Sequence, residues 1–298
     1  MTASADSRWR GYAETFGAAL VNGSIGTIVT YATMPTVMLV ALRMVFASAA
    51  LGLLIGVRHR WPRPKDRATG LRLLVLGVIL AANLTLYFVA IRETGVAVAI
   101  FTSYLAPVYV AVLGPRFAGG RTEGVVVVAL VVALVGMIAI LVPGLRGAGL
   151  SPGGLAAGLA AGVFYAVYLL LGKDLRRSGL ESTGIVFVMC AVTALVLLPW
   201  GLAQSSAADF SGVNVLMAAV LGVVTTALSF SLFIDGLHFI KVQHASIMGY
   251  IEPVSAPLYA LLFLGQKPSA WTLAGGALII AAGVVVVALG KAEEELYG

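Results

Sequence analysis

Apolar stretches of about twenty residues follow one another along the whole chain and are separated by short polar gaps. An α-helix of roughly 20 mostly apolar residues is long enough to cross the hydrocarbon core of a bilayer. The pattern therefore predicts an all-α, multi-pass membrane protein with ten transmembrane helices. The predicted spans lie near Tyr12–Tyr31, Thr36–Val57, Leu71–Ile91, Val96–Phe117, Val125–Val142, Leu155–Gly172, Thr183–Ala203, Val213–Gly236, Gln243–Gly265 and Trp271–Gly290.

The composition supports this interpretation. Hydrophobic residues make up 60% of the 298 residues and charged residues only 11%, whereas soluble domains have about 25% charged residues. The net charge is +6, but the basic residues occupy the short gaps instead of one helix face. We therefore expect a lipid bilayer as the surroundings and no nucleic acid as a partner.

Several motifs that carry chemistry are absent from the sequence. It has no phosphate-binding G-x-x-x-x-G-K-[ST], so ATP is not expected as a partner, and it has neither H-E-x-x-H nor G-x-S-x-G. One cysteine, Cys190, and three scattered histidines predict no metal site. We expect no cofactor, no catalytic residues and no enzymatic activity.

The basic residues also predict the orientation of the spans. Fifteen lysines and arginines lie in one alternate set of gaps and three in the other. Because basic residues accumulate on the cytoplasmic side, both termini are predicted to be cytoplasmic. The fifteen are Arg8, Arg10, Arg58, Arg60, Arg63, Lys65, Arg67, Arg72, Arg116, Arg121, Lys173, Arg176, Arg177, Lys241 and Lys291; the three are Arg92, Arg146 and Lys267.

Two segments, 98–107 and 244–253, repeat the same pattern 146 residues apart. The matched pairs are Ala99/Ala245, Tyr104/Tyr250 and Pro107/Pro253. A proline inside a helix removes a backbone hydrogen bond and kinks or breaks the helix. Matched helix breaks in the two halves of a membrane protein indicate a transport site.

The repetition extends over the whole chain. Leu76-Gly77-Val78 and Leu221-Gly222-Val223 begin the third and eighth predicted spans, and Gly136 and Gly283 lie late in the fifth and tenth. Five spans per copy place the second copy upside down relative to the first. We therefore expect two inverted five-helix repeats, residues 1–147 and 148–298, around a central cavity.

These features resemble the drug/metabolite transporter superfamily. They are the five-plus-five spans, the arginine of Leu42-Arg43-Met44, the Tyr-Leu-x-Pro and Tyr-x-Glu-Pro elements, and the glycine-rich last span. The chain is similar to the EamA-type exporters, and closely so to the YddG-type aromatic amino acid exporters. The resemblance implies a secondary transporter in the bacterial cytoplasmic (inner) membrane. Ala106 departs from the pattern, since the second copy has Glu252 in the matching position.

Two charged residues lie deep within predicted spans, where ionisable groups are expensive and mark functional sites. Arg43 and Glu252 have predicted depths that differ by roughly 6 Å, which an arginine side chain can bridge. We hypothesise that they pair or share a small polar network. The pair would either lock two helices together or serve as a coupling carboxylate or ligand for a substrate ammonium group, and both alternatives stay open.

Amide, hydroxyl and aromatic side chains mark the candidate cavity. Asn83 and Tyr87 are four residues apart and share a helix face, as do Phe164 and Tyr168. Such a lining suits a substrate with an apolar ring and a zwitterionic end. The candidate substrate-binding residues are Asn22, Asn83, Tyr87, Phe101, Tyr104, Phe164, Tyr165, Tyr168, Ser229, Phe233, Ser246 and Tyr250.

These patterns favour a secondary transporter that exports small metabolites, with amino acids, including aromatic ones, as the favoured substrates, by alternating access. Helix bending is expected at glycine and proline positions, and a monomer suffices for this mechanism. Export or facilitated diffusion of other small metabolites or drugs is the alternative, and an intramembrane enzyme or a non-transporting receptor fits the sequence less well. The candidate hinge residues are Gly95, Pro107, Gly114, Gly249, Pro253 and Pro257.

Overall fold

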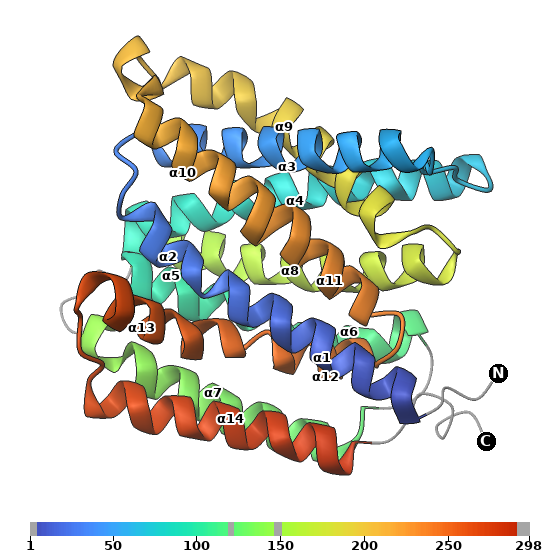
Figure 1. Ribbon diagram of the computed structural model, residues 1–298. Coiled ribbons are helices and arrows are strands. Elements are labelled where there is room, and N and C mark those ends of the chain that lie inside the picture. Colours follow the sequence, from blue (N-terminus) through green and yellow to red (C-terminus); the bar gives the residue numbers. More distant parts are fainter. Residues whose placement is uncertain (1–4, 119–121, 146–150, 291–298) are drawn as a thin grey trace.

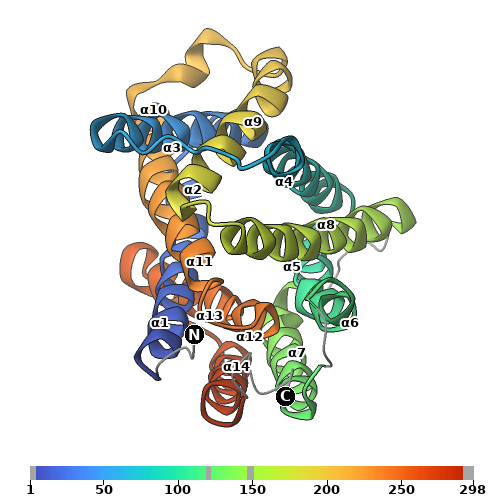
Figure 2. The same ribbon diagram turned by 90° about the vertical axis from the view of Figure 1, so that its right-hand side faces the viewer.

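The computed structural model describes residues 5–118, 122–145 and 151–290, and within them it contains helices and no strand. The predicted boundary between the halves, at residues 147 and 148, lies outside the described residues, as do Arg121, Arg146 and Lys291 of the predicted charge pattern. The helices run side by side in one bundle (Figure 1). Figure 2 views this bundle from the end at which α1 begins.

The first half contains seven helical segments that form five spans. They are α1 (Ala5–Asn22), α2 (Ser24–Val29), α3 (Thr36–Arg58), α4 (Arg67–Thr94), α5 (Val96–Ser103), α6 (Ala106–Ala118) and α7 (Gly124–Leu145).

The second half has the same order of spans with different interruptions. Its helices are α8 (Pro152–Arg177), α9 (Ser182–Ala203), α10 (Gly212–Gly222), α11 (Ser229–Gly236), α12 (Val242–Met248), α13 (Ile251–Leu264) and α14 (Ala270–Leu289). A short 3-10 turn, η1 (Ala207–Phe210), precedes α10, and a π-helical segment, η2 (Val223–Leu228), joins α10 to α11.

The predicted ten-span architecture is confirmed. In the described residues, nine helices are long and apolar enough to cross a membrane, and the bent helix formed by α1 and α2 supplies the tenth span. The bend lies at Gly23, where a side chain would collide with Ser255 and with the backbone of α13. The absence of a side chain at Gly23 thus allows α13 to approach the first span closely.

The matched prolines lie just after the helix breaks. The fourth span is interrupted at Tyr104–Leu105, and the ninth at Gly249–Tyr250. Pro107 and Pro253 then occupy the first turns of α6 and α13, where a missing N–H leaves no helical hydrogen bond unmade.

The two halves pack around a pseudo-two-fold axis. The fifth and tenth spans, α7 and α14, pack on each other, as do the second and seventh, α3 and α9. The pairing of α4 with α8 is matched by that of α1 with α11. Equivalent glycines make equivalent contacts: a Cβ on Gly77 would lie 3.0 Å from the Met189 carbonyl oxygen, and one on Gly222 would lie 2.6 Å from the Arg43 carbonyl oxygen. Met189 is therefore the counterpart of Arg43.

One end of the bundle, where α1 begins and α14 ends, carries most of the charged side chains. We call it the basic end and define it by Arg10, Arg60, Arg72, Arg176 and Lys241. Every ion pair recorded between described residues lies there, on the right-hand side of Figure 1.

Candidate functional site

A cavity of about 230 Å³ lies between the two halves. It is lined by the first four spans of the first half and by α8, α11 and the break between α12 and α13. The lining residues are Ala19, Asn22, Ile25, Arg43, Leu80, Asn83, Leu84, Tyr87, Ser103, Tyr104, Tyr165, Tyr168, Phe230, Phe233, Gly249 and Glu252.

Seven of the twelve predicted substrate-binding residues line this cavity. They are Asn22, Asn83, Tyr87, Tyr104, Tyr165, Tyr168 and Phe233. Both predicted charged residues, Arg43 and Glu252, line it as well.

The other five predicted residues do not line the cavity. Phe101 and Phe164 pack against the hydrophobic core. Ser246 is buried and donates to the carbonyl oxygen of Gln243 at 2.8 Å, while Ser229 and Tyr250 lie behind the lining residues and hold them in place, as described below. Periodicity alone could not show which face of each helix turns inward.

The face of α8 that meets the cavity also differs from the prediction. Tyr165 and Tyr168 both line it, and their rings stack with centroids 5.7 Å apart and planes 11° apart. Phe164, which we expected on the same helix face as Tyr168, packs against the hydrophobic core and does not line the cavity.

The Arg43 side chain is buried and bound by the π-helical segment. Its Nε donates to Thr226 Oγ1 at 2.5 Å, and its Nη2 donates to the Thr225 carbonyl oxygen at 3.2 Å. The guanidinium also lies 5.7 Å from the centre of the Phe230 ring. Sequence reasoning missed these partners, although two adjacent threonines within an apolar stretch were a signal for them.

Glu252 lies among phenols. The Tyr104 hydroxyl is close to its carboxyl group, and Tyr87 and Tyr165 are near enough to interact with it electrostatically. No ion pair within 4.0 Å joins Glu252 to Arg43 among those of the described residues. Of the two hypothesised arrangements, a direct pair or a shared polar network, the direct pair is therefore not formed here; both groups line one cavity and are near enough to interact electrostatically.

Two asparagines are fixed by hydrogen bonds to neighbouring helices. Asn22 Oδ1 accepts from Ser229 Oγ at 2.8 Å, and the same hydroxyl lies 2.9 Å from the Ala18 carbonyl oxygen. Asn83 Nδ2 donates to the Ala161 carbonyl oxygen at 2.8 Å. Ser229 thus acts on the cavity through Asn22.

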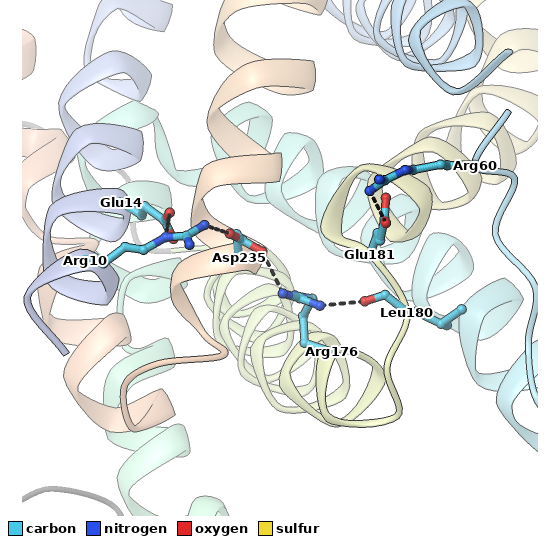
Figure 3. A network of polar contacts seen from close by, with 7 residues as sticks. All are labelled: Arg10, Glu14, Arg60, Arg176, Leu180, Glu181 and Asp235. Carbon is cyan, nitrogen blue, oxygen red and sulfur yellow. Dashed lines mark hydrogen bonds and ion pairs between the residues drawn. The ribbon is translucent and has the colours of Figure 1, made fainter. Parts of the chain in front are cut away.

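Polar contacts tie α1, α8 and α11 together at the basic end (Figure 3). Asp235 of α11 accepts from Arg10 of α1 and from Arg176 of α8, at 2.7 Å in each case. Arg10 also binds Glu14 at 2.7 Å, and this hydrogen bond raises the pKa of Arg10. Arg60 binds Glu181 nearby at 3.0 Å.

A second, buried cluster lies at the same end. Lys241 Nζ is 2.5 Å from Glu123 Oε1, His244 Nε2 is 3.4 Å from the same oxygen, and His244 Nδ1 is 2.7 Å from the Tyr12 hydroxyl. The cluster connects α1, the residue before α7, and α12. Together, these contacts join the helices at the basic end.

The candidate hinge residues differ in their surroundings. Gly249 lies in the break of the ninth span and lines the cavity, and Gly95 joins α4 to α5 with a positive φ of 85°. Gly114 packs against the Gln243 side chain within α6, and Pro257 lies inside α13. No group of three or more histidine, cysteine or acidic residues within the described part of the chain could hold a metal ion.

Comparison with known proteins places the chain among transporters. It is 34% identical over 214 residues to an uncharacterised transporter of Archaeoglobus fulgidus, which covers 72% of this chain and 75% of the relative. It is 26% identical to the threonine/homoserine exporter RhtA of Escherichia coli strain K12, over 78% of this chain and 77% of the relative.

The fold is also found among solved structures. One crystal structure superposes with a TM-score of 0.80 at 20% identity, covering 94% of this chain and 98% of the other. The EamA-like transporter family matches residues 9–142 and 152–289, which together make up most of the protein. This chain therefore belongs to the EamA-like transporter family.

Proposed function

We propose that this protein exports amino acids, including aromatic ones, out of the cytoplasm. The observation that carries the proposal is the cavity between the halves, which brings a guanidinium, a carboxyl group and four tyrosine rings to one small space. Aromatic side chains offer an apolar surface to a ring, and the two opposite charges suit the zwitterionic end of an amino acid. The relative named as an exporter of threonine and homoserine supports this substrate class.

The proposed mechanism is alternating access between the two inverted halves. Ion pairs join α1, α8 and α11 at the basic end, so a state open at that end would require these helices to separate there. Bending at Gly95, Pro107, Gly114, Gly249, Pro253 and Pro257 would allow this movement while the rest of each helix stays intact. Inverted repeats are related by a pseudo-two-fold axis, so exchanging the conformations of the two halves gives two states that open the same site to opposite sides of the membrane.

The expected location is the cytoplasmic (inner) membrane of a bacterium, with both termini cytoplasmic and the halves divided at residues 147 and 148. The basic end would then face the cytoplasm, in agreement with the excess of basic residues in its loops. One copy of the chain contains the complete cavity, so a monomer suffices for transport.

Counterflow in liposomes tests the proposal. The purified protein, loaded with one unlabelled amino acid, should accumulate labelled aromatic amino acids faster than cationic ones and faster than empty liposomes do. If no amino acid is taken up while other small metabolites or drugs are, the alternative substrate class is correct. A dependence on a pH gradient that is lost in Glu252→Gln would indicate proton coupling, and its absence would indicate facilitated diffusion.

A further inference from the structure

Arg43 is a buried cation with no carboxylate within ion-pair distance among the described residues, although Glu252 of the same cavity is near enough to interact with it electrostatically. Its side chain is only 8% exposed and lines the cavity. Its hydrogen-bond acceptors, Thr226 Oγ1 and the Thr225 carbonyl oxygen, are both neutral. A buried charge is costly unless an opposite charge accompanies it closely, so the Arg43 guanidinium favours an anionic group that enters the cavity and lies directly beside it.

The hydrogen bonds also leave part of the guanidinium fork available. Nε and Nη2 are used by the two threonines, and the hydrogen bonds between described residues do not involve Nη1. Arginine binds carboxylates with paired, coplanar N–H donors. The remaining donors fit a single carboxylate that approaches from the cavity.

The π-helical segment fixes the direction of this fork. The Thr226 hydroxyl donates to the Leu221 carbonyl oxygen at 3.1 Å, so its lone pairs are left to accept from Arg43 Nε. Single π-turns within helices occur frequently at functional sites. Here the wider turn brings the Thr225 carbonyl oxygen and the Thr226 hydroxyl to the same side chain.

Both charges of the cavity are unique to one copy of the repeat. Arg43 corresponds to Met189, as the equivalent glycine contacts show, and Glu252 corresponds to Ala106. The fold is built twice, but these charges are needed only once. An asymmetric ligand with one negative and one positive group would use each of them once.

We propose that Arg43 is the subsite for the carboxylate of the substrate and that Glu252, on the opposite wall, is the subsite for its ammonium group. The protein would then select α-amino acids over amines and over acids that lack the amino group, whatever their side chain. Thr226 is a positioning residue that acts through Arg43. This inference rests on the proposed export of amino acids.

The experiment compares three ligands that differ by one group. Phenylalanine, phenethylamine (no carboxylate) and 3-phenylpropionate (no ammonium) compete with labelled phenylalanine in counterflow. If the wild type prefers another amino acid, that amino acid and its two truncated analogues take their places. The wild type should bind the complete amino acid about tenfold or more better than either analogue, since each lost charged hydrogen bond costs about this much.

The variants identify which residue binds the carboxylate and which binds the ammonium group. Arg43→Gln should lose the preference for phenylalanine over phenethylamine but keep the preference for phenylalanine over 3-phenylpropionate. Glu252→Gln should lose the preference over 3-phenylpropionate but keep the preference over phenethylamine. Thr226→Val should raise KM for phenylalanine with little change in kcat. Arg72→Gln removes an exposed arginine that pairs with Asp174 at 3.0 Å and should behave as the wild type.

Two results separate failure of this inference from failure of the proposed function. If the wild type takes up no amino acid, the proposed function is wrong. If the wild type does take up amino acids, but Arg43→Gln still prefers phenylalanine over phenethylamine, Arg43 is not the carboxylate subsite. Should Arg43→Gln fold poorly, Thr226→Val with an unchanged KM overturns the proposal in the same way.

Discussion

Tyr104 and Tyr250, which occupy equivalent positions in the two halves, stack on each other at the centre of the protein. Their ring centroids lie 6.1 Å apart with planes at 22°, and the Tyr250 hydroxyl donates to the Tyr104 carbonyl oxygen at 2.6 Å. The contact is not symmetric, because the Tyr104 hydroxyl faces Glu252 instead of the Tyr250 carbonyl oxygen. The pair thus joins the breaks of the fourth and ninth spans.

Removal of the Tyr250 hydroxyl should weaken this junction. Tyr250→Phe keeps the stacked ring but loses the hydrogen bond, so we expect about 1 kcal/mol less stability in detergent unfolding and a several-fold change in turnover. Tyr104→Phe should instead change the pH dependence of transport, because it removes the hydroxyl that faces Glu252. Tyr259→Phe, on the far part of α13, is the matched control and should have little effect. Equal effects for all three variants would contradict a special role for the pair.

The spans and their inverted repetition were predictable because bilayer thickness and helix rise fix the length of an apolar stretch. The helix breaks were predictable because proline leaves a sequence signature. The inward faces were not: Phe164 and Tyr165 are neighbours in sequence, but only Tyr165 lines the cavity. The partner of Arg43 was missed because a π-turn, set by tertiary packing, directs Thr226 toward it.

Asp235 should control how often the basic end opens. It joins α11 to both Arg10 and Arg176 with side-chain exposure of only 20%. Asp235→Asn removes the charge from both contacts, which we expect to favour opening by about 1 kcal/mol, or roughly fivefold. A cysteine placed at Ala19, which lines the cavity, reports opening through its rate of labelling by a membrane-impermeant maleimide. Cys190 is buried and is replaced by alanine beforehand.

The matched control for this measurement is Glu181→Gln. Glu181 and Arg60 form an ion pair at the same end, but their side chains are 52% and 66% exposed, and exposed pairs contribute little. Labelling in this variant should proceed at the wild-type rate. A labelling rate that does not rise in Asp235→Asn would show that the ion pairs do not hold the basic end closed.

Close packing of α7 on α14 should depend on one of two adjacent glycines. A methyl group on Gly275 would collide with the Gly136 carbonyl oxygen and would lie 2.8 Å from Ile140, whereas one on Gly276 would lie 3.5 Å from Val254. Gly275→Ala should therefore destabilise the protein by about 1–3 kcal/mol, measured as the midpoint of thermal unfolding. Gly276→Ala, one residue along the same helix, should leave the midpoint nearly unchanged. Similar losses in both variants would contradict the close approach of the two helices.

The prolines after the two breaks should be needed for rapid turnover of the transporter. In a continuous ninth span, the N–H of residue 253 would bind the Gly249 carbonyl oxygen, and proline prevents this bond. Pro253→Ala supplies the missing backbone N–H and should let α12 and α13 join into one straight helix. The bend that the proposed alternating access requires would then be lost. Pro107→Ala should do the same in the fourth span through the Ser103 carbonyl oxygen.

We expect both variants to transport several-fold more slowly in proteoliposomes with little change in KM, since the cavity residues stay in place. Pro199→Ala, inside the uninterrupted α9, should keep the wild-type rate. Unchanged rates in Pro107→Ala and Pro253→Ala would exclude bending at these positions as the transport movement.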